Sequence, residues 1–179
     1  MEIHVKFKVI CILLSALFFI SAEAFSEPTH ITVRVKTKDA KFLGTSMGGA
    51  LVTITNAQTN KQLARGVTEG ATGNTNLIMI NPLKRGVPIS DERSAKYIAT
   101  IDIDEPTQIL VTAQGPLSES HAINSVQATQ WVMPGKHINR GDAMMLELPG
   151  LMVKLMSPAP DDSFDGVKRI EIQAVVRMM

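Results

Sequence analysis

The most constraining feature of this sequence is a two-residue alternation of apolar and polar side chains that recurs in short runs. It is clearest over residues 31–36, 95–103 and 167–177, and such alternation is typical of strands with one buried face. Glycine and proline turns separate the runs, and no amphipathic helical pattern stands out beyond residue 24. About nine short strands at this spacing predict an antiparallel sandwich or barrel.

The first 24 residues have the order of a secretory signal peptide. Lys6 and Lys8 precede an apolar run over residues 9–20, and Ala22-Glu23-Ala24 offers small residues at a cleavage site. The apolar run is too short to span a bilayer core of roughly 30 Å. We therefore expect a signal peptide over residues 1–24, one domain over residues 25–179, and a periplasmic or secreted location.

Cysteine usage and charge exclude several classes of protein. The sole cysteine, Cys11, lies in the predicted signal peptide, so no disulfide is expected in the mature chain. The charges nearly cancel, with 18 Lys and Arg against 17 Asp and Glu, which argues against nucleic-acid binding. No later apolar run is long enough to form a membrane-spanning helix.

The longest connection between predicted strands runs over residues 81–94. A short strand is predicted before it, over residues 76–80. Loops of this length are often functional, so Arg85 and Arg93 are candidate partner-binding residues. The preferred interpretation is a solvated crossover between two sheets.

The segment from Gly49 to Thr75 carries a strand-and-turn motif. A strand reading A-x-V-T-I-T-N begins at Ala50, a turn at Thr59-Asn60-Lys61 follows, and a second strand leads to Gly73-Asn74-Thr75. This segment resembles the repeating core of the carboxypeptidase-regulatory-like and transthyretin-like sandwiches. The resemblance implies a non-catalytic accessory or binding module, and it transfers no catalytic residue.

Methionine and histidine offer a candidate metal site. Met152 and Met156 are predicted on one face of a strand, and His137 or His121 would add a nitrogen ligand. Thioether sulfur selects Cu(I). The preferred interpretation is core packing, because methionine fills irregular gaps in protein interiors.

Trp131 and His137 flank the turn at Pro134-Gly135 and are candidate partner-binding residues. An exposed tryptophan beside a turn can anchor a partner. The preferred interpretation is a tryptophan buried inside the sandwich.

A polar segment holds the residue types of a hydrolase. Ser118, Ser120 and His121 lie beside Glu119. A nucleophilic serine needs a sharp turn and a base within reach, and no G-x-S-x-G motif occurs in the chain. A solvated loop is the preferred interpretation.

The sequence thus predicts an exported, all-β sandwich of immunoglobulin or transthyretin-like type with about seven to nine strands. Its expected role is to bind another envelope or secreted protein, without catalysis and without a cofactor. A periplasmic copper-binding protein is the alternative, and a hydrolase is a distant third.

Overall fold

The computed structural model describes residues 27–159, 161–166 and 169–179. Nine strands lie within these residues, which confirms the prediction of an all-β chain. Their bounds are β1 Thr29–Thr37, β2 Leu51–Asn56, β3 Gln62–Val67, β4 Tyr97–Ile101, β5 Thr107–Gly115, β6 Asn124–Val132, β7 Met144–Leu148, β8 Leu151–Ser157 and β9 Gln173–Met178. The predicted signal peptide lies outside the described residues.

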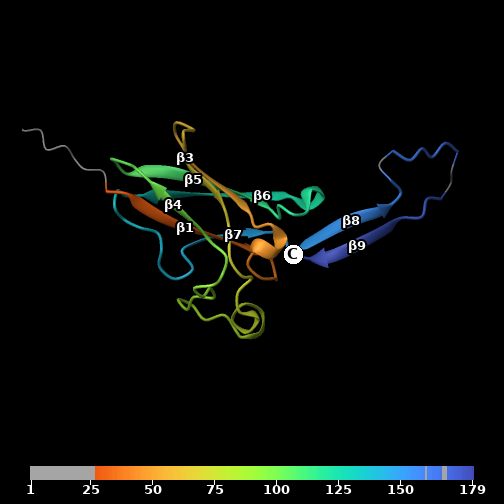
Figure 1. Cartoon of the computed structure of the whole chain (residues 1–179), viewed down its shortest axis with the longest axis horizontal. Coiled ribbons are helices and arrows are strands. Elements are labelled where there is room, and N and C mark those ends of the chain that lie inside the picture. Colours follow the sequence, from red (N-terminus) through yellow and green to blue (C-terminus); the bar gives the residue numbers. More distant parts are fainter. Residues whose placement is uncertain (1–26, 160, 167–168) are drawn as a thin grey trace, which may run out of the picture.

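Seven of these strands form two sheets that pack face to face, as in a β-sandwich (Figure 1). One sheet has the order β4-β1-β7 and the other β3-β2-β5-β6. The remaining strands, β8 and β9, pair with each other and project from the sandwich as a hairpin. The edge strands are therefore β4 and β7 in the first sheet and β3 and β6 in the second.

One strand pair departs from the predicted antiparallel arrangement. β1 pairs with β7 in parallel, from Val33 opposite Met144 to Thr37 opposite Leu148. Parallel neighbours need a long connection between them, and here β2 to β6 all lie between the two strands in the chain. Alternation within a strand does not encode the direction of its neighbour, so the sequence pattern missed this pairing.

The core lies between the two sheets and follows the alternation seen in the sequence. From the three-stranded sheet, β1 contributes Ile31, Val33 and Val35, all fully buried. The opposite sheet contributes alternate residues of its two central strands, namely Val52, Ile54, Ile109, Val111 and Ala113. These β-branched residues suit a pleated surface that packs against a second sheet.

The segment Asn76–Ile80, predicted as a strand, is instead a single π-helical turn, η2. The side-chain oxygen of Asn74 accepts hydrogen bonds from the backbone N–H groups of Asn76 and Leu77, at 2.9 and 3.4 Å. Asparagine favours such local bonds, which compete with pairing in a sheet. Only Ile78 of this turn is buried, against Phe42 and Ala95.

Two 3-10 turns complete the secondary structure, η1 at Thr45–Met47 and η3 at Ser120–Ala122. Among the described residues, no helix has the length and apolar character needed to cross a membrane.

Truncation of the core should destabilise the protein far more than truncation of the surface. Ile54→Ala removes a fully buried side chain and should lower the free energy of unfolding by about 2–5 kcal/mol. Ile98→Ala is the matched control on β4, where the side chain is 56% exposed, and should change it by less than about 1 kcal/mol. Urea denaturation measures both values, and equal effects would contradict this core.

Candidate functional site

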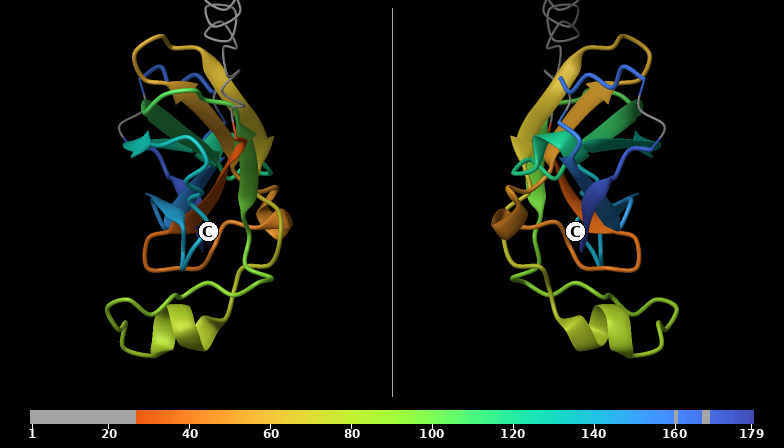
Figure 2. Two further views of the ribbon diagram at one scale, coloured as in Figure 1. Left: turned by 90° about the vertical axis from the view of Figure 1, so that its left-hand side faces the viewer. Right: turned by 90° about the vertical axis from the view of Figure 1, so that its right-hand side faces the viewer.

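The long connection forms a compact lobe, defined here as residues 74–94, beside the sandwich. Figure 2 shows it as the yellow-green segment that carries η2 and hangs below the strands. Ile78 and Ile89 pack inward against a small core that contains Phe42, Ala95 and Met145. The connection crosses from β3 of one sheet to β4 of the other, and residues 81–88 are exposed, while Ile78 and Ile89 add local packing.

Asp142 fixes the second half of the lobe from outside it. Its Oδ1 accepts hydrogen bonds from the backbone N–H groups of Ile89 and Ser90, at 3.0 and 2.8 Å. Its Oδ2 lies 3.1 Å from the same Ile89 nitrogen. A charged acceptor strengthens such bonds, so Asp142 holds this backbone in one position.

Arg34 fixes the point at which the lobe rejoins the sandwich. This β1 residue is only 6% exposed, and its Nη1 donates to the carbonyl oxygens of Ser94 and Ala95 at 2.6 and 3.2 Å. The guanidinium carbon lies 5.9 Å from the centroid of the Phe42 ring. Burial lowers the pKa of Arg34 below its usual value, and the negative charges of Asp142 and Asp91 partly offset that effect.

A turn at the end of the lobe completes its attachment. Asp91 Oδ1 accepts hydrogen bonds from the hydroxyl and the backbone N–H of Ser94, at 2.7 and 2.8 Å, and from the N–H of Arg93 at 3.1 Å. The hydroxyl of Ser94 is the main reason that the pKa of Asp91 lies below its ordinary value. Because these bonds favour the carboxylate, the turn keeps them at neutral pH and loses them in acid as Asp91 becomes protonated.

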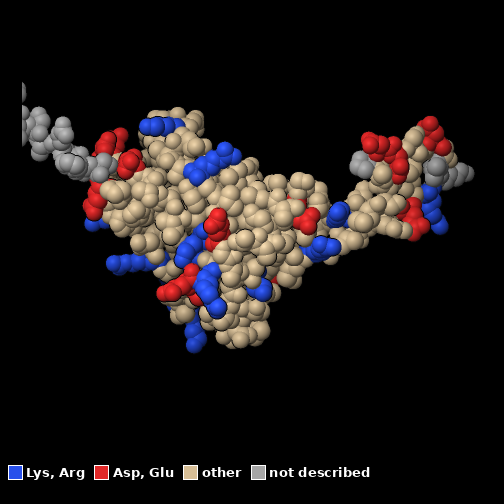
Figure 3. Space-filling model, in the orientation of Figure 1, with Lys and Arg blue, Asp and Glu red and all other residues tan. Residues whose placement is uncertain are grey.

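The outer surface of the lobe is largely apolar. Its large exposed side chains are Leu77, Met79, Ile80, Leu83 and Val87. A shallow pocket of about 190 Å³ lies among them, lined partly by Leu77, Leu83 and Val87. Lys84 and Arg85 follow Leu83 in the chain, and the end of the lobe adds Asp91, Glu92 and Arg93. In Figure 3 the lobe is the mainly tan region at the lower edge of the molecule.

The structure places the predicted partner-binding residues in two different regions. Arg85 and Arg93 are both exposed and belong to the lobe. Trp131 lies on β6 with 56% of its surface exposed, so the preferred interpretation of a buried tryptophan is wrong. His137 lies in the loop after β6 and its ring stacks near that of His30, with centroids 4.8 Å apart.

The structure brings two of the candidate metal ligands, Met152 and His121, to one cavity and leaves Met156 and His137 outside it. Met152 is buried and lines a cavity of about 40 Å³ with His121, Glu119, Lys154, Val175 and Arg177. Met156 is 57% exposed, as are the residues of β8 just before it, and the strand pairing is irregular between Leu155 and Ser157. His137 uses Nδ1 to accept the N–H of His30 at 3.1 Å, so its neutral ring carries its proton on the other nitrogen.

Two further features of the described residues bear on metal binding. No group of three or more His, Cys, Asp or Glu is arranged to hold an ion within that part of the chain. Lys154 and Arg177 bring positive charge to the cavity beside Met152 and His121, which disfavours a cation there.

The polar residues of the hydrolase hypothesis lie at η3. His121 Nδ1 is 3.7 Å from Glu119 Oε2, and both groups are partly exposed. Ser120 is an exposed neighbour in the same 3-10 turn, and the described contacts include no hydrogen bond between its hydroxyl and His121. A serine nucleophile requires that bond to its base.

Comparison with known protein families, with curated proteins and with solved structures finds no significant match.

The residues that build the lobe were not found by sequence reasoning. Asp142 and Arg34 lie far from it in sequence, and each looks like an ordinary surface charge within a turn or an alternating strand. The available signal was the group of apolar residues within 77–83, which lies in a stretch without Asp or Glu from residue 70 to residue 90. Residues 76–80 were predicted as a strand, so the exposed apolar surface that they help to form was not predicted.

Removal of the Asp142 carboxylate should loosen the lobe and leave the sandwich intact. In Asp142→Ala, the N–H groups of Ile89 and Ser90 lose their acceptor, which should lower stability by about 1–3 kcal/mol. Hydrogen exchange of these two amides should become at least roughly tenfold faster, as local opening becomes easier. Asp142→Asn keeps one acceptor oxygen and should show a smaller change. Unchanged exchange in Asp142→Ala would contradict the role assigned to this residue.

Proposed function

We propose that this protein is an exported, non-catalytic module of immunoglobulin or transthyretin-like sandwich type that binds another protein of the cell envelope. The lobe is its docking surface. The single observation that carries the proposal is a lobe anchored at several points that nevertheless presents large apolar side chains to solvent.

The anchoring supports a binding role because it reduces the entropic cost of association. Asp142, Arg34 and the Asp91 turn hold the backbone of the lobe at separate points. A surface loop that served only as a connection would gain nothing from a buried arginine, which is costly to desolvate. A loop that must present a fixed surface gains affinity from preorganisation.

The chemistry of the lobe indicates the chemistry of its partner. Ile80 and Leu83 are both 67% exposed, and clustered apolar side chains of this size mark interaction sites on soluble proteins. Lys84 and Arg85 add positive charge next to them. The partner surface is therefore an apolar groove with acidic residues at its rim, because complementary charge guides such encounters.

Site-specific crosslinking tests this proposal. A photo-crosslinking amino acid at Leu83, in the protein within its own envelope, should give one dominant protein adduct. Ile80→Asp should reduce that adduct at least tenfold, since it places a charge in the centre of the apolar contact. Ile98→Asp is the matched control, because Ile98 is also exposed and apolar but lies on β4 of the sandwich. Both variants should keep the circular dichroism spectrum of the parent.

Other results would contradict the proposal that the lobe binds a protein. Absence of a protein adduct, or an adduct that Ile80→Asp leaves unchanged, overturns the proposal. Binding to vesicles of phosphatidylglycerol that is lost in Ile80→Asp would assign the lobe to a lipid surface instead.

A further inference from the structure

The hairpin of β8 and β9 lacks the support that an isolated hairpin needs. It pairs within itself, from Leu151 opposite Met178 to Ser157 opposite Gln173, and extends away from both sheets (Figure 1). Two strands alone are at best marginally stable in water, and a third strand or a packed face is normally required. The hairpin is therefore the element of this fold that most needs a partner.

The two faces of the hairpin differ sharply in chemistry. On the face toward η3, Met152, Lys154, Val175 and Arg177 line the small cavity that Glu119 and His121 close. The opposite face consists of three apolar cross-strand pairs and carries no polar side chain, the pairs being Leu151 with Met178, Val153 with Val176, and Leu155 with Ala174. Val176 is 60% exposed and its neighbour Val175 is 38% exposed. On the face toward η3 only Met152 is buried among these four residues, and the six residues of the apolar face are all exposed.

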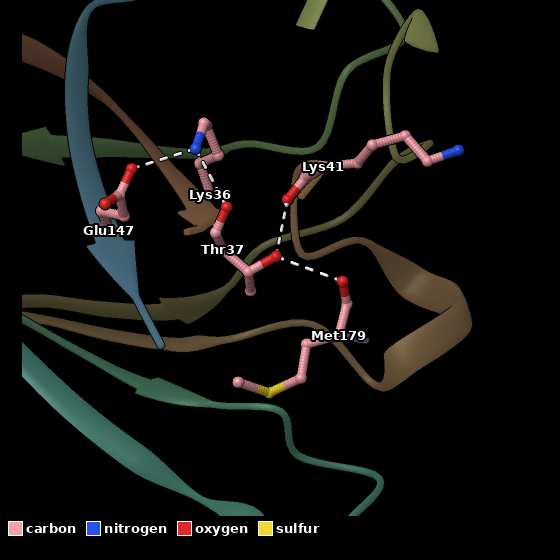
Figure 4. A network of polar contacts seen from close by, with 5 residues as sticks. All are labelled: Lys36, Thr37, Lys41, Glu147 and Met179. Carbon is pink, nitrogen blue, oxygen red and sulfur yellow. Dashed lines mark hydrogen bonds and ion pairs between the residues drawn. The ribbon is translucent and has the colours of Figure 1, made fainter. Parts of the chain in front are cut away.

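The base of the hairpin is fixed, so the apolar face keeps its direction. The buried hydroxyl of Thr37 lies 3.2 Å from the carbonyl oxygens of both Lys41 and Met179 (Figure 4). The N–H of Met179 donates to the carbonyl of Gly150 at 2.9 Å. Gly150 also packs so closely on the Lys38 carbonyl oxygen that a β-carbon would collide with it. These contacts tie both strands of the hairpin to the end of β1.

We propose that the apolar face docks onto the same face of a second copy of this chain. The two hairpins lie antiparallel around a two-fold axis that passes near the Val153–Val176 pair, the middle pair of the face. A two-fold interface uses one patch twice, so that patch must complement itself. An uncharged aliphatic face meets this requirement, because nothing on it repels its own copy.

The distribution of charge along the hairpin favours the antiparallel arrangement. Among the described residues at its far end, Asp161, Asp162, Asp165 and Glu171 stand against one cation, Arg169. Figure 3 shows mainly acidic side chains at this end, with a basic one among them. Parallel packing would bring the two acidic ends together, whereas antiparallel packing keeps them apart.

The area of the face is sufficient for a specific dimer. Six aliphatic side chains exposed to this degree offer on the order of 500 Å² on each chain, hence about 1,000 Å² in the pair, which reaches the lower bound for a specific interface. A hollow beside the face, lined partly by Lys38, Leu151 and Met178, adds surface for the far end of the partner hairpin. This interface is separate from the lobe, so it goes beyond the proposed function and can fail independently of it.

Sedimentation velocity over a concentration series tests the dimer. The purified protein should sediment as a dimer that dissociates on dilution. Val176→Asp should weaken dimerisation at least 100-fold. Val175→Asp is the matched control, since it makes the same change one residue away on the opposite face. It should leave the dimer within about threefold of the parent.

Cysteine crosslinking tests the axis without disturbing the fold. In a Cys11→Ser background, Val153→Cys should form a disulfide-linked dimer readily, because residue 153 lies close to its own copy across the axis. Leu155→Cys should not crosslink to itself, because it lies one pair away from the axis. A mixture of the Leu155→Cys and Leu151→Cys proteins should crosslink to each other.

Several results would overturn the proposal. A protein that sediments as a monomer at every concentration excludes the dimer. A dimer that survives Val176→Asp, or that Val175→Asp disrupts equally, excludes this face. A dimer in which Leu155→Cys crosslinks to itself and Val153→Cys does not excludes the antiparallel arrangement.

Discussion

Burial of β1 is the constraint on which the rest of the structure depends. Val33 and Val35 fill the space between the two sheets, and β4 and β7 pair with β1 on its two sides. The other face of the strand is also covered, and there Arg34 binds the carbonyl groups at the end of the lobe. At the end of β1, the hydroxyl of Thr37 donates to the carbonyl oxygen of Met179 beside the base of the hairpin. One central strand therefore positions the core, the lobe and the hairpin together.

The all-β character of the fold was predictable because it depends on local pattern. Alternation in the sequence identifies β1 and β4 within one or two residues of their ends. The parallel pairing of β1 with β7 was not predictable in this way, because it depends on the order in which all the intervening strands fill the sheets. The turn at Asn76–Ile80 was mispredicted because four apolar residues in sequence suit either a strand or a helix. The hydrogen bonds that Asn74 Oδ1 accepts favour the helical turn.

The candidate surfaces were harder to predict, because alternation shows that a strand has two unlike faces but not which face is covered. In β8 and β9 neither face is covered along its length, since only Met152 is buried beside η3 and the aliphatic face is exposed. Trp131 was wrongly predicted to be buried because the sequence does not show which face of β6 is covered. In the lobe, the backbone at Ile89 and Ser90 is held by Asp142, which is more than 50 residues away in the chain. The exposure of the candidate surfaces therefore depends on tertiary contacts that no local pattern records.

The separation of lobe and hairpin has a consequence for affinity. A dimer joined through its hairpins carries two lobes, and each is held in a fixed position on its own sandwich by Asp142 and Arg34. If the partner is itself oligomeric or dense in the envelope, the second lobe binds at a high effective concentration once the first is engaged. Each lobe then needs only modest affinity, which fits a small apolar surface with two cations. Dimerisation and docking would thus act on different surfaces and strengthen each other without direct contact.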